Sequence, residues 1–198
     1  MPRRWSMEGY TVVELMLTVA MVAVLAVVTL PPVIQAVQKR EVVNAAQAVL
    51  DLVEFSKVQA AMRNRAYEVE ITFPNGGNAV FKVNEGGSSA CVNLNATEGV
   101  RQLVLDQHFP SIQVVGLTPA DVRDPTTNRW AVCIKPDGRV LRPDTGMPFT
   151  SGAASGYAAG EVRISLSRFS DPNTRDGIIH DVLVPFNGAA RVTTQGAL

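Results

Sequence analysis

An uncharged apolar run preceded by one acidic residue constrains this chain more than any other feature. Residues 15–38 contain no Asp, Glu, Lys or Arg, and Glu14 stands immediately before them. The first twenty of these residues, 15–34, would reach about 30 Å as a helix, which matches the thickness of the hydrocarbon core of a bilayer. The sequence therefore predicts a membrane-spanning helix with an acidic side chain at its start.

Glu14 is predicted to need a partner of opposite charge. An ionisable side chain among the apolar residues of a span costs on the order of 3 kcal/mol, so it indicates a functional group. If the chain were cut after Gly9, the new amino terminus on Tyr10 would lie four residues from Glu14, about one helical turn away. The amine could come from the same chain or from a neighbouring copy.

A family resemblance supports this interpretation. The residues that carry it are Gly9, Tyr10, Thr11, Val12, Val13, Glu14, Leu15, Met16 and Pro31. They resemble the amino-terminal segment of type IV pilins and type II secretion pseudopilins, in which a prepilin peptidase removes a short basic leader after the glycine. The resemblance implies cleavage between Gly9 and Tyr10, N-methylation of Tyr10 in place of the usual Phe, and neutralisation of the adjacent subunit's amino terminus by Glu14.

Three alternatives stay open for the same segment. The first is an ordinary secretory signal, with Arg3 and Arg4 as its basic start and Ala26 as its cleavage site. The apolar run continues past Ala26, which disfavours this alternative. The second is a plain membrane anchor with no role in assembly. In the third, Glu14 only caps the first turn of the helix at headgroup level and pairs with nothing.

Two consecutive prolines divide the predicted helix. Pro31 and Pro32 each remove a backbone donor and crowd the carbonyl group four residues earlier, so we expect a kink there. The resemblance implies that this stretch bends or partly unwinds on assembly. Beyond the prolines, apolar residues at spacings of three and four continue to about Ala60 and predict an amphipathic helix that ends near Met62.

The remaining 130 or so residues predict a β-rich domain of ordinary size. Apolar and polar residues alternate from Tyr67 to Phe73, and residues 74–78 carry turn signals that lead into a second strand. Further turns are expected at 136–138, 171–173 and 186–188. Strands are also expected at 79–83, 91–94, 101–105, 112–115, 130–134, 139–142, 161–167, 178–184 and 190–194.

The predicted fold class is α+β. A long, kinked N-terminal helix, transmembrane in its first half, would be followed by a mostly antiparallel β domain of two small sheets, one of them packed on the helix. The expected organisation is a leader at 1–9, a transmembrane and filament-core helix at 10–34, an amphipathic helix at 35–62 and a periplasmic β-rich domain at 63–198.

The charges before the span predict that this domain lies outside the cytoplasm, and this location bears on its two cysteines. Arg3 and Arg4 precede the span, so the positive-inside tendency leaves the leader in the cytoplasm and the domain in a periplasm. Cys91 and Cys133 both lie in the exported part, where an even count favours a disulfide. The bridge would close a ring of about 40 residues and contribute roughly 4 kcal/mol. Two buried free thiols are the alternative.

No enzyme, cofactor or metal site is predicted. The chain has two histidines, His108 and His180, and no closely spaced cysteine pair. It also lacks a nucleophile-elbow sequence and a glycine-rich phosphate loop. Alternation along a strand would place His180 and Asp181 on opposite faces, so we expect His180 to be a structural residue.

Domain order supplies a second, more limited resemblance. A helix followed only by strands, with Pro136-Asp137-Gly138-Arg139 late in the chain, resembles the minor-pilin and minor-pseudopilin branch of GspH/FimT type. It implies a minor subunit of a type IV pilus, in its initiation or tip complex, with other pilins, the prepilin peptidase and the inner-membrane assembly platform as partners. A minor pseudopilin of type II secretion and a DNA-binding minor pilin for DNA uptake are the alternatives.

Two further features of the sequence bear on possible partners. Basic and acidic residues both number 18, so the composition does not indicate a nucleic-acid partner. The glycine-rich segment 143–160, which contains Phe149 and Tyr157, is expected to be a mobile loop, either a solvated connector or a partner-binding loop. Candidate DNA contacts are limited to Arg123, Arg129, Lys135, Arg139, Arg142 and Arg191.

Overall fold

The computed structural model divides the chain into two compact units, Met1–Arg40 and Glu41–Leu198. It describes residues 11–74, 79–92, 94, 98–119, 123–124, 128–149, 160–171 and 174–194. Helix α1 (Val12–Arg63) begins in the first unit and ends in the second. Its last residue lies next to the predicted end at Met62.

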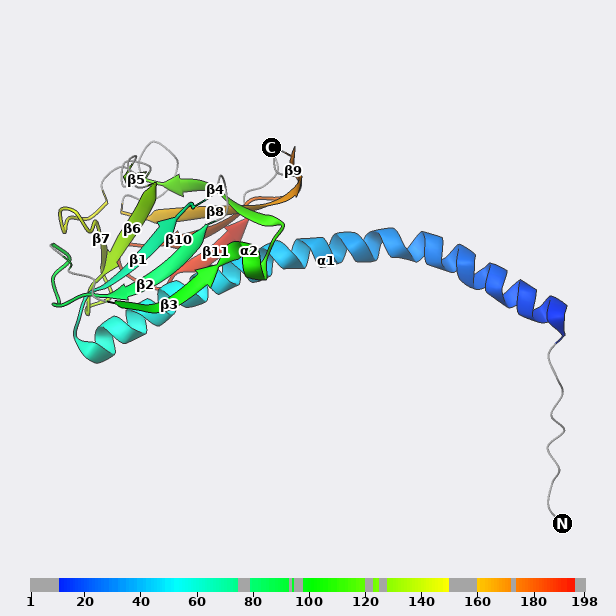
Figure 1. The fold of residues 1–198 in the computed structure, drawn as a ribbon, viewed down its shortest axis with the longest axis horizontal. Helices are drawn as coiled ribbons and strands as arrows, with labels where there is room; N and C mark the ends of the chain where they lie inside the picture. Colours follow the sequence, from blue (N-terminus) through cyan, green and yellow to red (C-terminus); the bar gives the residue numbers. More distant parts are fainter. Residues whose placement is uncertain are drawn as a thin grey trace, which may run out of the picture. The chain divides into compact units, whose positions relative to one another are not determined.

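In the first unit, α1 is a bent helix (Figure 1). Thr11 caps its start, because the Thr11 side-chain Oγ1 accepts a hydrogen bond from the backbone N–H of Glu14 at 3.3 Å. The helix continues through Pro31 and Pro32 without a break. A kink located at these two prolines therefore remains a prediction.

In the second unit, α1 buries one face in the domain core. Residues at spacings of three and four, including Val42, Val49 and Val53, are almost completely shielded from water, as amphipathic periodicity predicts. Ser56 lies on the same buried face and donates its hydroxyl hydrogen bond to the Leu52 carbonyl at 2.7 Å. The buried hydroxyl group of Ser56 is therefore paired within the helix.

The strands form two antiparallel sheets. Sheet A has the order β3-β2-β1-β6-β5, with β7 paired to β6, and sheet B has the order β11-β10-β8-β4, with β9 paired to β8. The strands of sheet A are β1 (Tyr67–Thr72), β2 (Val80–Glu85), β3 (Glu98–Val104), β5 (Arg123–Asp124), β6 (Arg129–Ile134) and β7 (Val140–Leu141). Sheet B contains β4 (Ile112–Thr118), β8 (Val162–Asp171), β9 (Thr174–Arg175), β10 (His180–Val184) and β11 (Arg191–Thr194).

One hydrophobic core joins the helix to both sheets. Val49 of α1, Phe81 of sheet A and Ile164 of sheet B belong to the same buried cluster. A cation–π contact also links the helix to sheet A: the Arg101 guanidinium of β3 lies 5.0 Å from the ring centroid of Phe55 on α1. The α+β fold class with two small sheets is confirmed, but both sheets pack on the helix where we expected one.

Two of the hairpins that the sequence predicted are present, and local turn chemistry explains the one that joins β6 to β7. Strands β1 and β2 pair in the expected antiparallel hairpin. Gly138, in the predicted turn at 136–138, has a φ of 80°, a conformation that glycine adopts without a steric penalty. The turn joins β6 to β7, and the Arg139 N–H donates to the Asp137 carboxylate at 3.1 Å.

The expected strand at 91–94 is wrong for its described residues. Cys91 lies in a bend and Val92 in a turn. Leu105, expected to end a strand, instead begins the short helix α2 (Leu105–His108), in which the Leu105 side chain is buried in the core. The very short strands β5 and β9 carry too few residues for an alternating pattern to be visible in the sequence.

Candidate functional site

The exposed apolar length of α1 is the most distinctive surface of the first unit. None of the side chains described between Val12 and Val37 is buried, and Val12 and Val27 are 75% and 73% exposed. Within the described residues, α1 is the helix that is long and apolar enough to cross a membrane. Such a surface can be covered by lipid or by similar helices.

Glu14 lies in the first turn of this helix and its side chain is exposed. Within the described part of the chain it makes no ion pair, and Gly9 and Tyr10 lie outside the described residues. Leader cleavage, N-methylation and the pairing of Glu14 with an amine therefore remain predictions. Sequence reasoning missed the role of Thr11, although the spacing Thr-x-x-Glu is a recognised helix-start signal.

The structure joins Cys91 and Cys133 in a disulfide, with their Cα atoms 5.8 Å apart. The predicted bridge is confirmed, and the alternative of two free thiols is wrong. Both cysteines are buried in a small second cluster with Ala66 and Leu141. The bond attaches the segment after β2 to strand β6, which pairs with β1, 42 residues further along the chain.

A row of hydrogen-bonded side chains crosses the outer face of sheet A. Arg129 of β6 contacts Glu68 at 2.6 Å and Glu70 at 3.1 Å, both on β1. Asn84 of β2 donates to Glu70 at 3.0 Å. Alternation along β1 predicts the outward direction of both glutamates, but Glu68 is only 4% exposed. Burial raises the pKa of Glu68, while the positive charge of Arg129 opposes this increase.

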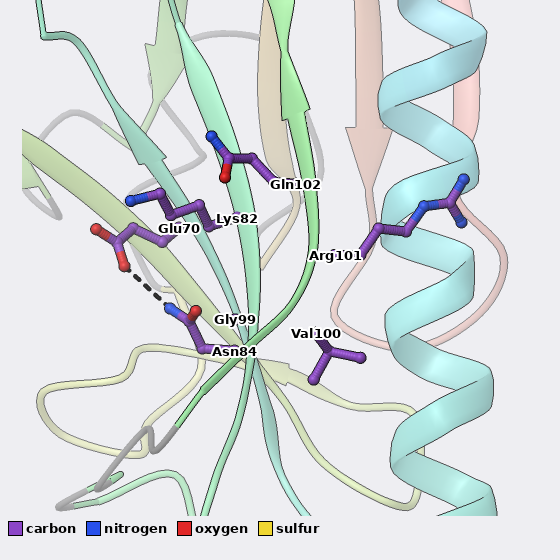
Figure 2. Close-up of a pocket in the computed structure, with 7 residues that line it drawn as sticks. All are labelled: Glu70, Lys82, Asn84, Gly99, Val100, Arg101 and Gln102. Atoms are coloured by element: carbon purple, nitrogen blue, oxygen red, sulfur yellow. Dashed lines mark hydrogen bonds between the residues drawn. The ribbon is translucent and has the colours of Figure 1, made fainter.

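A shallow hollow of about 440 Å³ lies beside this row, over β1, β2 and β3 (Figure 2). Lys82, Asn84 and Gln102 line it, and Figure 2 shows Arg101 turned away from them toward α1. These are the side chains of an ordinary solvated sheet face. The described residues contain no group of His, Cys, Asp or Glu arranged to hold a metal ion.

The candidate DNA-contacting residues come from different sheets, and most of them are already paired with carboxylates. Arg139 contacts Asp137 and Arg142 contacts Asp144 at 3.0 Å, while Arg191 contacts Glu161 at 2.8 Å. Hydrogen bonds from the two arginines lower the pKa of Asp137 and of Asp144. Arg129 is bound as described above, Lys135 lies just after β6, and the Arg123 side chain lies outside the described residues. DNA contact through these residues remains a prediction.

The beginning of segment 143–160 is anchored to the domain. The Phe149 side chain, expected in a mobile loop, is 2% exposed and belongs to the main core. The Arg142 N–H donates to the Met147 carbonyl and the Gly146 N–H donates to the Arg142 carbonyl, both at 2.9 Å. Tyr157 and the other residues of 150–159 lie outside the described residues, so partner binding by this segment remains a prediction.

His180 and Asp181 are built into sheet B. His180 lies opposite Leu166 and Asp181 opposite Ser165 in the pairing of β10 with β8. Asp181 is completely buried, and its carboxylate lies 3.7 Å from the Arg163 guanidinium. Burial lowers the pKa of His180. Both residues are therefore buried parts of the β8–β10 pairing, and a structural role for His180 remains a prediction.

Comparison with known proteins gives a similarity of fold. No family model matches the sequence, and no curated protein matches it. The structure is similar to two crystal forms of the type IV minor pilin FimU of Pseudomonas aeruginosa, with TM-scores of 0.45 and 0.42 and identities of 9% and 8%. The matches cover 79% and 77% of this chain and 90% of each FimU chain. At these identities the similarity concerns the fold alone.

Proposed function

We propose that this chain is a minor pilin, a structural subunit of a type IV pilus that acts at initiation or at the tip. Its precursor would span the inner membrane once and be cut between Gly9 and Tyr10, with the β domain in the periplasm. The observation that carries the proposal is the exposed apolar surface of α1 from Val12 to Val37, headed by a single acidic residue.

Exposing that apolar surface to water is unfavourable in free energy, so another apolar surface or lipid is expected to cover it. Fully burying one large apolar side chain is worth about 1.5–3 kcal/mol, and more than ten such side chains are exposed on this stretch of α1. A bilayer can cover them, but it leaves the Glu14 carboxylate beside hydrocarbon. Packing among similar helices covers the same surface and can bring an amine from a processed neighbour to Glu14. Assembly therefore satisfies both requirements, whereas lipid satisfies one.

The proposed role involves partners and no catalysis. The prepilin peptidase would process the leader, the inner-membrane platform would extract the subunit, and other pilins would contact its helix. These assignments rest on the resemblance at residues 9–16 and on the exposed helix. The same features suit a type II secretion pseudopilus, so the experiment must identify the filament.

The decisive test combines processing with location. The intact mass of the membrane-extracted protein should correspond to residues 10–198 plus one methyl group, and the protein should appear in the sheared pilus fraction. Loss of residues 1–26 would instead indicate a secreted domain and contradict the proposal. An unprocessed protein that never enters a fibre would also contradict it.

A further inference from the structure

Two side chains one helical turn apart on α1 hold the turn between β10 and β11. The Ala190 N–H donates to the Glu54 carboxylate at 2.8 Å. The Lys57 ammonium donates to the Gly188 carbonyl at 2.8 Å and to Glu54 at 3.0 Å. The Glu54 carboxylate thus binds a backbone donor of the turn, and the Lys57 ammonium binds a backbone acceptor of the same turn. The two side chains also bind each other.

This arrangement is more than a surface ion pair. The Lys57 side chain is 10% exposed and the Glu54 side chain 36% exposed, so the pair is partly shielded from water. Hydrogen bonds to ionised groups are about twice as strong as those between neutral groups. Gly188 has a φ of 110°, a conformation that favours glycine, and its carbonyl is the group that Lys57 binds. The glycine that the turn conformation favours is therefore also the residue whose carbonyl binds the helix.

Phe186 is attached to the domain, because it packs against the disulfide cluster and its carbonyl accepts a hydrogen bond from the Val140 N–H at 2.9 Å. Among the described residues, the part of the segment that follows Phe186 has fewer attachments. Strand β11 has four residues and none of them is buried, whereas all five residues of β10 are buried. Ala190 and Val192 pack against the core but remain partly exposed. Strand β11 is joined to the domain by its ladder with β10 and by an ion pair from Arg191 to Glu161. Elements with few buried apolar contacts are the ones that open locally.

We propose that residues 187–194 form a strap that α1 latches through Glu54 and Lys57, and that this strap opens as a unit while the rest of the domain stays folded. Opening withdraws Ala190 and Val192 from the edge of the core and frees the two latch side chains on the helix. The latch thereby sets how firmly the C-terminal end of sheet B is attached to α1. The inference goes beyond the proposed filament role and does not depend on it.

Hydrogen exchange of the full chain in detergent micelles tests the strap directly. In the unaltered protein, amides of residues 191–194 should exchange faster than those of Val182 and Leu183. Glu54→Ala and Lys57→Met each remove one side of the latch and should accelerate exchange at 191–194 about tenfold, as expected for loss of one charged hydrogen bond. Asp51→Ala, which removes an exposed acid that accepts a hydrogen bond from Gln47 on the same helix, is the matched control and should change nothing.

Three outcomes would overturn the proposal. The first is protection of residues 191–194 equal to that of β10 in the unaltered protein. The second is unchanged exchange in both latch variants. The third is an equal acceleration of β1 and β2, which would show that the variants destabilise the whole domain and do not release a strap. Because pilus assembly is not measured, each outcome leaves the filament proposal to its own test.

Discussion

At the scale of single residues, Glu14 combines two roles that sequence and structure reveal separately. Its backbone N–H is capped by Thr11, which fixes the first turn of α1. Its carboxylate lies at the start of an apolar surface, where a charged group needs a counter-charge. The backbone contact belongs to the folding of the helix, whereas the proposed role of the side chain is in assembly.

Substitution of Glu14 should therefore separate insertion from assembly. Glu14→Gln keeps the side-chain size and the Thr11 cap but removes the charge, so membrane insertion and leader cleavage should be preserved. Incorporation into sheared pili should fall about tenfold, corresponding to loss of an interaction worth about 1.4 kcal/mol. Quantitative immunoblotting of the pilus and membrane fractions measures this ratio. Asp51→Asn, which neutralises an acid beyond the apolar run, is the control, and normal incorporation of Glu14→Gln would contradict the charge pair.

His180 should make the stability of the domain depend on pH. Because burial lowers its pKa in the folded state, the unfolded chain binds a proton more readily. The free energy of unfolding should therefore decrease as the pH falls below about 6.5, the ordinary pKa of histidine, toward the lower folded value. Chemical denaturation between pH 8 and pH 5 measures this decrease.

His180→Gln is the appropriate comparison because it removes the titrating group and keeps a polar side chain at the same strand position. The difference in unfolding free energy between the unaltered protein and this variant should shrink, and then change sign or level off, as the pH falls. A difference independent of pH would show that His180 does not titrate differently in the folded and unfolded states.

At the scale of elements, the corner between α1 and β1 shows how a helix is oriented toward a sheet. Arg63 at the end of the helix, Arg65 in the connection and Tyr67 at the start of β1 all contact the Glu85 carboxylate on β2, at 2.6, 3.3 and 3.0 Å. The hydrogen bond from Tyr67 is the main cause that lowers the pKa of Glu85, and burial raises the pKa of Tyr67. The Glu85 carboxylate thus contacts the end of the helix, the connection and the start of β1.

The disulfide is a covalent link at the same end of these strands, since Cys133 pairs with Glu68 and packs with Ala66. Replacing both cysteines, Cys91→Ala with Cys133→Ala, should lower the free energy of unfolding by about 4 kcal/mol, because the unfolded chain loses a ring that spans about 40 residues. Denaturant melts of the full chain in detergent measure the change. A reductant present throughout should lower the stability of the unaltered protein by a similar amount and leave the double variant unchanged. Equal stability with and without reductant would contradict a structural role.

At the scale of the whole molecule, the second unit contains its own hydrophobic core. The exposed apolar stretch of α1 precedes this unit in the sequence. The fragment 36–198 should therefore be soluble without detergent, monomeric and cooperatively folded. Size-exclusion chromatography and a thermal melt provide the measurement. A fragment that aggregates or unfolds without a sharp transition would show that residues 11–35 contribute to folding of the domain.

The same fragment tests the DNA-binding alternative. Because Arg129, Arg139, Arg142 and Arg191 each contact a carboxylate, little unpaired positive charge remains on them for phosphate groups. We expect no retention on immobilised double-stranded DNA at low salt. Retention that decreases steeply with added salt would instead favour a DNA-uptake role.

The sequence by itself determined the features that depend on neighbours along the chain. Helical periodicity gave α1 and its end within one residue, alternation gave β1, and glycine in Pro136-Asp137-Gly138 marked the β6–β7 turn. The uncharged run after Glu14 likewise needs no tertiary information. These signals are local because helices, strands and turns are set by the spacing of side chains and by backbone sterics.

Only the tertiary structure decided which distant residues meet. It placed Glu68 beneath Arg129, Phe149 in the core, and the Glu54 carboxylate against the Ala190 N–H, 136 positions away. It also joined both sheets to one helix, where the sequence suggested one sheet. No spacing rule encodes these contacts, because they result from packing all the elements at once, and burial then changes the pairing and the pKa of each polar group enclosed.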